Sequence, residues 1–200
     1  MCFKGSSDGL VLCTTNFSSQ NYYYVCNPLT KEWVSLPPPP TEQINVQTGF
    51  TCESSLISKS YKVIRVSQGQ GSFKIDIFTS DLDEWNVYDV LYPPGVYHGC
   101  SIYDNHDTCN GVFYWYQKVY NNVLAFSVDR INKHQTCGNE IRLINFPDRQ
   151  IDNENRYFNQ SIKWQQRDLH QCLGESEGTI CFAIIEQAER SLSVWVLEEN

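Results

Sequence analysis

The sequence predicts an all-β fold, specifically a partial β-propeller of antiparallel blades. Aromatic residues make up 14% of the chain and favour strands, whereas Met occurs once. Trp33 and Trp85 each open the last strand of a unit just after an acidic turn, at an interval on the order of 50 residues that is typical of propeller blades. We therefore expect Trp33, Trp85 and Trp195 to pack between blades. Roughly four blade-like units are expected, the last incomplete, near residues 5–40, 50–95, 98–147 and 160–200.

The first unit contains three predicted strands. The turn Ser7-Asp8-Gly9 precedes the short apolar run Leu10–Cys13, and Tyr22–Cys26 follows as a second strand. Glu32–Leu36 is the third, and the four prolines Pro37–Pro40 end it. Because proline cannot donate to a sheet ladder, this run is predicted to be an extended connector to the next unit.

The second unit shows the clearest strand signal. Tyr61–Val66 and Phe73–Phe78 both alternate apolar and polar residues with a period of two. The Gly-containing loop Gln68–Gly71 joins them, which predicts a β-hairpin. This loop is not a phosphate-binding loop, since such a loop needs a helix after it and a strand follows here. A further strand starts at Trp85 and ends before Pro93-Pro94.

The last two units are marked by the turns Asn110-Gly111 and Glu177-Gly178. Five apolar runs are predicted as their strands, namely Val112–Tyr116, Asn122–Val128, Ile141–Phe146, Thr179–Ile185 and Ser193–Leu197. Asp148–Gln171 is rich in Asn, Gln, Arg and Asp, and either a long loop with an embedded strand or a short helix is compatible with it. An incomplete last unit would leave an exposed edge near Trp195–Glu199 and an uncovered blade face. Our hypothesis is that the natural protein is longer or that this chain is a fragment.

Charge and composition exclude several function classes. A net charge of −8 and a pI near 4.9 argue against nucleic-acid and anionic-membrane partners. The N-terminus lacks a signal-peptide pattern and no run approaches the ~18 apolar residues of a membrane span, so we expect an intracellular protein, cytoplasmic and/or nuclear. The nine cysteines are odd in number and irregularly spaced. Cys13, Cys26 and Cys181 lie inside apolar runs, which predicts reduced core thiols.

One constellation suggests metal chemistry. His98, Cys100, His106 and Cys109 supply two imidazoles and two thiols, a set that could hold a tetrahedral metal. Their order is not a standard zinc spacing, so a polar loop with incidental Cys and His is the preferred interpretation. No nucleophile motif is present. We expect no metal, no cofactor, no catalytic residue and no enzyme activity.

Three sets of motifs carry a family resemblance. They are Gly5–Cys13 (GSSDGLVLC), Cys26–Pro37 (CNPLTKEWVSLP), and the pair Asn110–Trp115 (NGVFYW) and Leu192–Leu197 (LSVWVL). As an ordered set across nearly the whole chain, they resemble the F-box-associated interaction domain of plant F-box proteins, a kelch-like propeller region. The chain departs from the family in two ways: Met1 lies only a few residues before the first unit, so no F-box is expected in it, and the family's further Trp-bearing strand after the last motif is missing.

The resemblance implies the substrate receptor of an SCF-type ubiquitin ligase. In such proteins the F-box docks to a Skp-type adaptor, the propeller binds the protein to be ubiquitinated, and other subunits carry the chemistry. We expect a non-catalytic protein-interaction module whose partner is a target protein, with the Skp-type adaptor a partner only if an F-box exists upstream. Target binding is expected on loops such as Asp104–Asn110 and Asp129–Asn139, and no individual residue is singled out as a contact. The alternatives are a propeller enzyme or carbohydrate-binding protein, which would need convergent acids at the central channel, or a truncated product without ligase function.

Overall fold

The computed structural model is built entirely from β-strands in the part that it describes. It describes residues 1–15, 20–43, 46–54, 59–92, 106–117, 122–127, 141–145, 169–186 and 190–197. Fifteen strands form four antiparallel sheets, so the predicted all-β propeller fold is confirmed. Within these ranges no helix is long and apolar enough to cross a membrane.

Each sheet is formed by strands that are consecutive in the sequence. Sheet 1 contains β1 (Cys2–Ser7), β2 (Leu10–Thr14), β3 (Tyr23–Asn27) and β4 (Glu32–Ser35). Sheet 2 contains β5 (Gln47–Ser54), β6 (Lys59–Gln68), β7 (Ser72–Thr79) and β8 (Glu84–Leu91). Sheet 3 contains β9 (His106–Cys109), β10 (Val112–Gln117), β11 (Asn122–Ser127) and β12 (Ile141–Asn145). Sheet 4 contains β13 (Leu169–Ser176), β14 (Thr179–Glu186) and β15 (Ser191–Val196).

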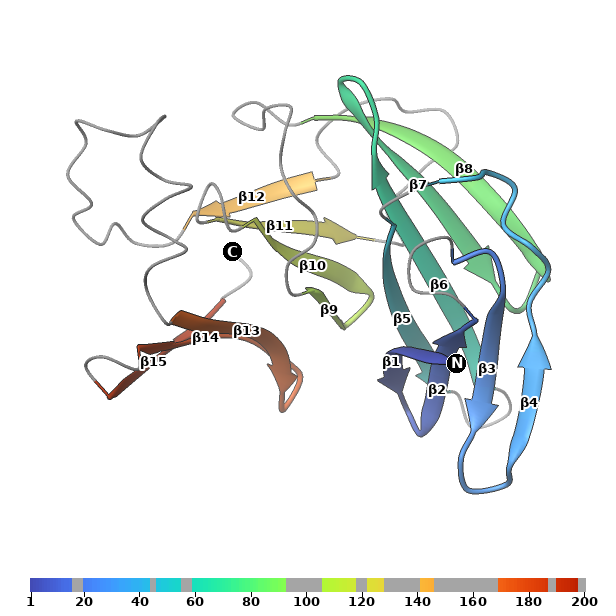
Figure 1. The fold of residues 1–200 in the computed structure, drawn as a ribbon, viewed down its shortest axis with the longest axis horizontal. Helices are drawn as coiled ribbons and strands as arrows, with labels where there is room; N and C mark the ends of the chain where they lie inside the picture. Colours follow the sequence, from blue (N-terminus) through green and yellow to red (C-terminus); the bar gives the residue numbers. More distant parts are fainter. Residues whose placement is uncertain are drawn as a thin grey trace.

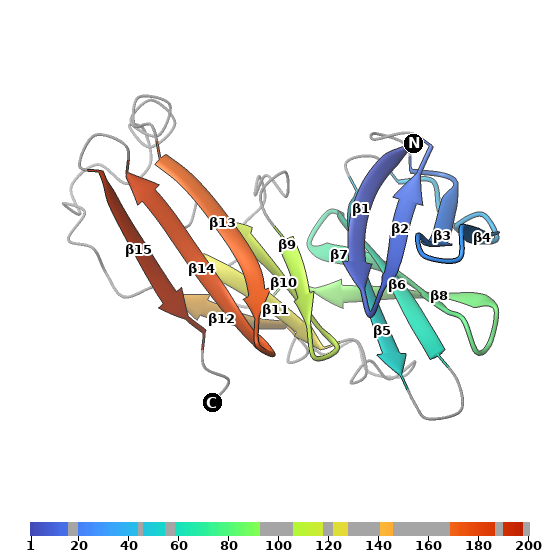
Figure 2. The same ribbon diagram turned by 90° about the horizontal axis from the view of Figure 1, so that it is seen from below.

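The sheets follow one another around a common axis as propeller blades (Figure 1). The first strand of each sheet is innermost: β1 contacts β5, β5 contacts β9 and β9 contacts β13. In Figures 1 and 2 the first and fourth sheets lie at opposite sides of the molecule, with the second and third between them. This arrangement brings the ends of the four inner strands together near the axis.

Tight turns join the inner strands of sheets 1, 3 and 4 to the strands that follow them. At Asp8-Gly9, φ is 46° and 77°, at Asn110-Gly111 it is 49° and 73°, and at Glu177-Gly178 it is 51° and 76°. Two successive residues with positive φ are the signature of the type I′ hairpin turn, whose twist matches that of the flanking strands. The turns expected at these three places are therefore present, and they fix where the inner strands end.

The four inner strands are the ones that sequence analysis missed. The Asp104–Asn110 segment was expected to be a loop, but His106–Cys109 forms β9, and Leu169–Ser176, which overlaps the segment of undecided structure, forms β13. The physical reason is composition: β9 (HDTC) has no apolar–polar alternation, because an inner strand has little apolar area to bury on the axial side. The expected binding loop Asp129–Asn139 lies outside the described residues.

Three apolar junctions hold the sheets together. We call the face of a sheet toward the preceding sheet its leading face, and the other its trailing face. The trailing face of sheet 1 (Leu12, Tyr23, Val25) packs on the leading face of sheet 2 (Phe50, Val63, Phe78, Trp85). The trailing face of sheet 2 (Ile64, Phe73, Ile75, Ile77) packs on the leading face of sheet 3 (Phe113, Trp115, Leu124, Phe126). The trailing face of sheet 3 (Tyr114, Tyr116, Val123, Ala125) packs on the leading face of sheet 4 (Leu173, Phe182, Ile184, Trp195).

A tryptophan occupies the leading face at every junction. Trp85 contacts Tyr23 with ring centroids 6.0 Å apart, and its Nε1 donates a hydrogen bond to the Pro37 carbonyl oxygen at 2.8 Å. Trp115 contacts Phe73 at 5.3 Å and Trp195 packs against the third junction. The expected packing between blades is thus confirmed for Trp85 and Trp195 but is wrong for Trp33, which is 63% exposed because none of the described sheets packs on the leading face of sheet 1.

A buried ion pair reinforces the first junction. Arg65 and Asp76 lie opposite each other on β6 and β7, and the Arg65 Nη1 donates to Asp76 Oδ2. Asp76 Oδ2 also accepts from Thr41 Oγ1 at 2.6 Å and from Gln43 Nε2 at 3.1 Å. Arg65 Nε donates to the Tyr23 hydroxyl oxygen at 3.2 Å. The network ties the connector after the proline run to sheets 1 and 2, so the connector's path depends on this pair.

Candidate functional site

A polar cleft of about 510 Å³ lies where the four inner strands end. Its lining comes from all four sheets, namely Ser7, Thr51, Cys52, Glu53, Thr108, Cys109, Asn110, Gly111 and Glu175. The cleft therefore occupies one mouth of the propeller axis, beside the three type I′ turns. A rigid scaffold that presents side chains from several strand ends is a common way of building a binding site.

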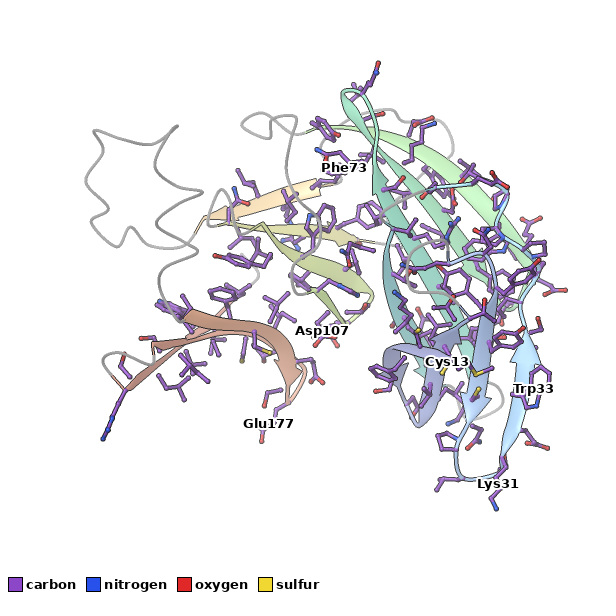
Figure 3. The ribbon with its side chains drawn as sticks, viewed as in Figure 1. Cys13, Lys31, Trp33, Phe73, Asp107 and Glu177 are labelled. Atoms are coloured by element: carbon purple, nitrogen blue, oxygen red, sulfur yellow. The ribbon has the colours of Figure 1, made fainter. Side chains whose placement is uncertain are left out.

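One wall of the cleft joins sheets 3 and 4. Asp107 Oδ2 accepts a hydrogen bond from the Glu175 amide at 3.0 Å, and Oδ1 accepts one from the Thr108 amide at 2.7 Å. Asn110 Nδ2 donates to the Gly178 carbonyl oxygen at 2.9 Å. In Figure 3, Asp107 lies where β9 approaches β13, and Glu177 lies at the following turn. These bonds fix the two turns relative to each other, so this wall is ordered before any ligand arrives.

The opposite wall joins sheets 1 and 2. The Ser7 hydroxyl oxygen accepts a hydrogen bond from the Cys52 amide at 3.0 Å. Lys59 Nζ forms an ion pair with Asp8 at 2.9 Å, and Lys62 forms a longer one with Glu53 at 3.4 Å. The Ser7–Cys52 hydrogen bond and the Lys59–Asp8 ion pair thus join the two sheets, whereas the Lys62–Glu53 pair lies within sheet 2.

Among the described residues that line the cleft, the charged side chains are acidic, and the lysines beside them, Lys59 and Lys62, pair with Asp8 and Glu53. Glu53 and Glu175 are the charged members, and the other groups are hydroxyls, thiols, an amide and a glycine. Such a surface accepts hydrogen bonds and attracts cationic or donor-rich ligands. The cleft thiols are poor nucleophiles, because Cys109 is buried and burial raises the pKa of Cys52 to about 11.

Of the four residues considered as metal ligands, only two are described. His98 and Cys100 lie outside the described residues. His106 and Cys109 are three positions apart on β9, so their side chains point to opposite faces of the strand and cannot share one ion. The His106 Nε2 forms a hydrogen bond with the Thr48 carbonyl oxygen at 2.9 Å, and burial lowers the pKa of His106. In the described ranges no three His, Cys, Asp or Glu side chains gather as a metal site, and the absence of a metal stays a prediction.

Sequence analysis did not find the acidic residues of the cleft. Glu53 and Glu175 of the lining, and Asp107 beside it, lie on inner strands, and Asp107 and Glu175 stand three and two positions before a type I′ turn. The signal that would have found them is the repeated placement of an acid just before the inner turn. Without the inner strands assigned, nothing in the sequence brings these positions together.

Fold and cleft together define a β-propeller that presents a polar, acidic mouth at the ends of its inner strands. A family model described as F-box protein At3g26010-like, beta-propeller, matches residues 1–200, and the chain belongs to this family. The chain is also similar to the putative F-box protein At3g23950 of Arabidopsis thaliana, at 26% identity over 210 residues. That alignment covers 96% of this chain and 45% of the relative, so the chain spans about half the relative's length. The predicted resemblance to F-box proteins is confirmed, while the kelch-type grouping of the blades stays a prediction.

Proposed function

We propose that this chain is the target-binding region of an F-box-type ubiquitin ligase receptor and that it has no catalytic activity of its own. Family membership supports the receptor role, because the matched family is named for F-box proteins. The observation that carries the binding role is the cleft, whose walls are prearranged by hydrogen bonds between sheets. A prearranged site loses little conformational entropy when a partner binds.

The cleft also indicates what kind of segment it holds. Glu53 and Glu175 bring two carboxylates to the lining, where Glu53 lies beside Lys62 and Glu175 accepts a hydrogen bond from the Gly178 amide. The hydroxyls of Thr51 and Thr108 and the Asn110 amide offer further hydrogen-bonding groups. A target loop that carries Lys or Arg side chains fits this chemistry. A carbohydrate is not favoured, because the described residues that line the cleft include no aromatic side chain on which a sugar ring could stack.

In this proposal the remaining roles belong to other parts of the ligase. A Skp-type adaptor is a partner only where an F-box is joined to the propeller, and ubiquitin transfer is carried out by other subunits. The proposal includes an intracellular location, in the cytoplasm, the nucleus or both. Seven free cysteines in the described ranges are compatible with a compartment that keeps thiols reduced.

Quantitative affinity purification from plant cell extract tests the proposal. The baits are the wild-type chain, Glu175→Lys in the cleft, and Glu84→Lys as a control with the same charge change at the exposed start of β8. We expect a set of proteins that the wild type and the control retain and that Glu175→Lys loses. Equal retention of the same proteins on all three folded baits would refute the role of the cleft.

A further inference from the structure

The turn between β9 and β10 holds the one Asn-Gly dipeptide of the 200-residue sequence, Asn110-Gly111. In the corresponding turns of sheets 1 and 4 the position of Asn110 is taken by an acid, Asp8 or Glu177, which is also followed by glycine. Asn110 therefore has a side-chain amide where its two counterparts have a carboxylate. This amide joins two blades, because its Nδ2 donates to the Gly178 carbonyl oxygen at 2.9 Å and ties the inner turn of sheet 3 to that of sheet 4.

An asparagine that precedes a glycine can lose its side-chain amide without an enzyme. The backbone nitrogen of Gly111 attacks Cγ of Asn110, a C–N bond forms, the attacking nitrogen loses its proton, and the side-chain nitrogen leaves as ammonia. One water molecule then opens the resulting succinimide ring at either of its carbonyls, which gives aspartate or isoaspartate with no oxidation or reduction. Glycine favours the attack, because it has no Cβ to crowd its nitrogen. The attacking group belongs to the same turn, so the reaction needs no partner and no catalyst.

The folded turn restrains this reaction. Its backbone has the type I′ conformation, and Cys109 and Val112 pair directly on either side of it. Ring closure requires the Asn110 side chain to leave the Gly178 carbonyl and to turn back on its own backbone. The reaction therefore proceeds from a locally opened turn, and the wall between sheets 3 and 4 sets how often the turn opens.

We propose that Asn110 is a deamidation site and that its conversion breaks the bond between the inner turns of sheets 3 and 4. Aspartate has no N–H to donate, so it places an acceptor where a donor now faces the Gly178 carbonyl oxygen. It also adds a negative charge to a lining that already contains Glu53 and Glu175. Isoaspartate lengthens the backbone of a two-residue turn, which the type I′ geometry does not accommodate. The change is irreversible, so it accumulates in the cleft as the protein ages.

Peptide mapping by mass spectrometry, after long incubation of the folded chain in mildly alkaline buffer, tests the site. We expect Asn110 to convert to both products well before Asn86, which precedes a valine. Asn27 is the internal blank, because it precedes Pro28, whose nitrogen has no proton to lose. The chain unfolded in guanidinium chloride gives the rate without the turn. Conversion of Asn110 in the unfolded chain but not in the folded one would overturn the proposal, and so would conversion no faster than that of Asn86.

Two matched variants test whether the wall controls the reaction. Asp107→Ala removes the hydrogen bonds that its carboxylate accepts from the Glu175 and Thr108 amides, and it should speed the conversion of Asn110 in the folded chain. In Figure 3, Asp107 lies beside the strand that leads to the Glu177 turn. Asp89→Ala, at an exposed position of β8, is the control and should leave the rate unchanged. Equal rates in the two variants would refute control by the wall.

Asn110→Asp reproduces the aspartate product and tests its effect on the wall. Hydrogen exchange of the Glu175 and Gly178 amides should become about two- to tenfold faster, as the loss of one hydrogen bond predicts. Asn86→Asp makes the same charge change on β8, away from the cleft, and should leave both amides unaffected. Equal exchange of these amides in the two variants would show that deamidation does not open the wall, which overturns the proposed consequence.

Discussion

Replacing Arg65 by Met should show how far the buried ion pair supports the first junction. Arg65 and Asp76 are both 0% exposed, and Met matches the length of the side chain without its charge. The substitution leaves the Asp76 carboxylate with the two hydrogen bonds from Thr41 and Gln43 and without a cation. Removing one partner of a buried pair costs about 3–5 kcal/mol, because an uncompensated charge stays behind. For a chain of this size that corresponds to a fall in Tm of about 6–20 °C.

Chemical denaturation of the wild type and three variants provides the assay. Lys62→Met is the control, since its partner Glu53 is largely exposed and surface pairs contribute about 0–1 kcal/mol. The double variant Arg65→Met with Asp76→Leu should recover most of the loss, because it removes both charges and keeps the volume filled. A loss below about 1 kcal/mol in Arg65→Met, or a double variant no more stable than the single one, would refute the reasoning.

The pKa of Asp76 predicts how the stability loss of Arg65→Met depends on pH. Burial raises the pKa of Asp76, and the hydrogen bonds from Thr41, Arg65 and Gln43 offset only part of this effect. A carboxyl group with a raised folded-state pKa favours the folded protein below its unfolded pKa and loses that contribution as the pH rises through the folded pKa. Because removing Arg65 raises the pKa of Asp76 further, the deficit of Arg65→Met should shrink as the pH falls. A deficit that grows in acid would contradict this account.

Three further predictions follow from single residues. Gly49→Ala should lower the free energy of unfolding by about 1–3 kcal/mol, because a Cβ there would overlap the Phe113 ring and lie 2.9 Å from Thr108 Oγ1. Gly5→Ala is the control and should be nearly neutral, since its nearest contact is at 3.4 Å. Equal melting temperatures of the two variants would contradict this prediction. Burial lowers the pKa of His106 below 6.5, so the wild type should lose stability as the pH falls below that value, by at most ~1.4 kcal/mol per pH unit. In denaturation titrations, His106→Gln should lack this pH dependence. Mass-spectrometric mapping of iodoacetamide labelling should find exposed Cys172 modified well before Cys52, whose pKa burial raises to about 11; comparable rates would be inconsistent with the structure.

Strands with an apolar face were predictable from the sequence. The hairpin of β6 and β7 follows from alternation in Tyr61–Val66 and Phe73–Phe78, a local signal that needs no knowledge of neighbouring sheets. The inner strands were not predictable in this way. β9 carries His, Asp, Thr and Cys, and it pairs with the adjacent β10. Its flanks are formed by β5 and β13, so part of its stability comes from neighbours far away in the sequence.

The cleft depends even more on the tertiary structure. Glu53 and Glu175 are separated by most of the chain, and they share a cleft only because β5 and β13 end at the same mouth of the axis. The exposure of Trp33 was also beyond the sequence, since Glu32-Trp33 and Glu84-Trp85 look alike locally and differ in whether one of the described sheets packs on the tryptophan.

The sequence by itself determined the all-β propeller class, the turns and the family, because alternation, turn residues and ordered motifs are short-range properties of the chain. Only the tertiary structure decided which strands face the axis, which acids line the cleft and which apolar faces pack on another of the described sheets. The physical reason is that a sheet has two faces, and local sequence shows that a face is apolar but not whether another sheet lies against it.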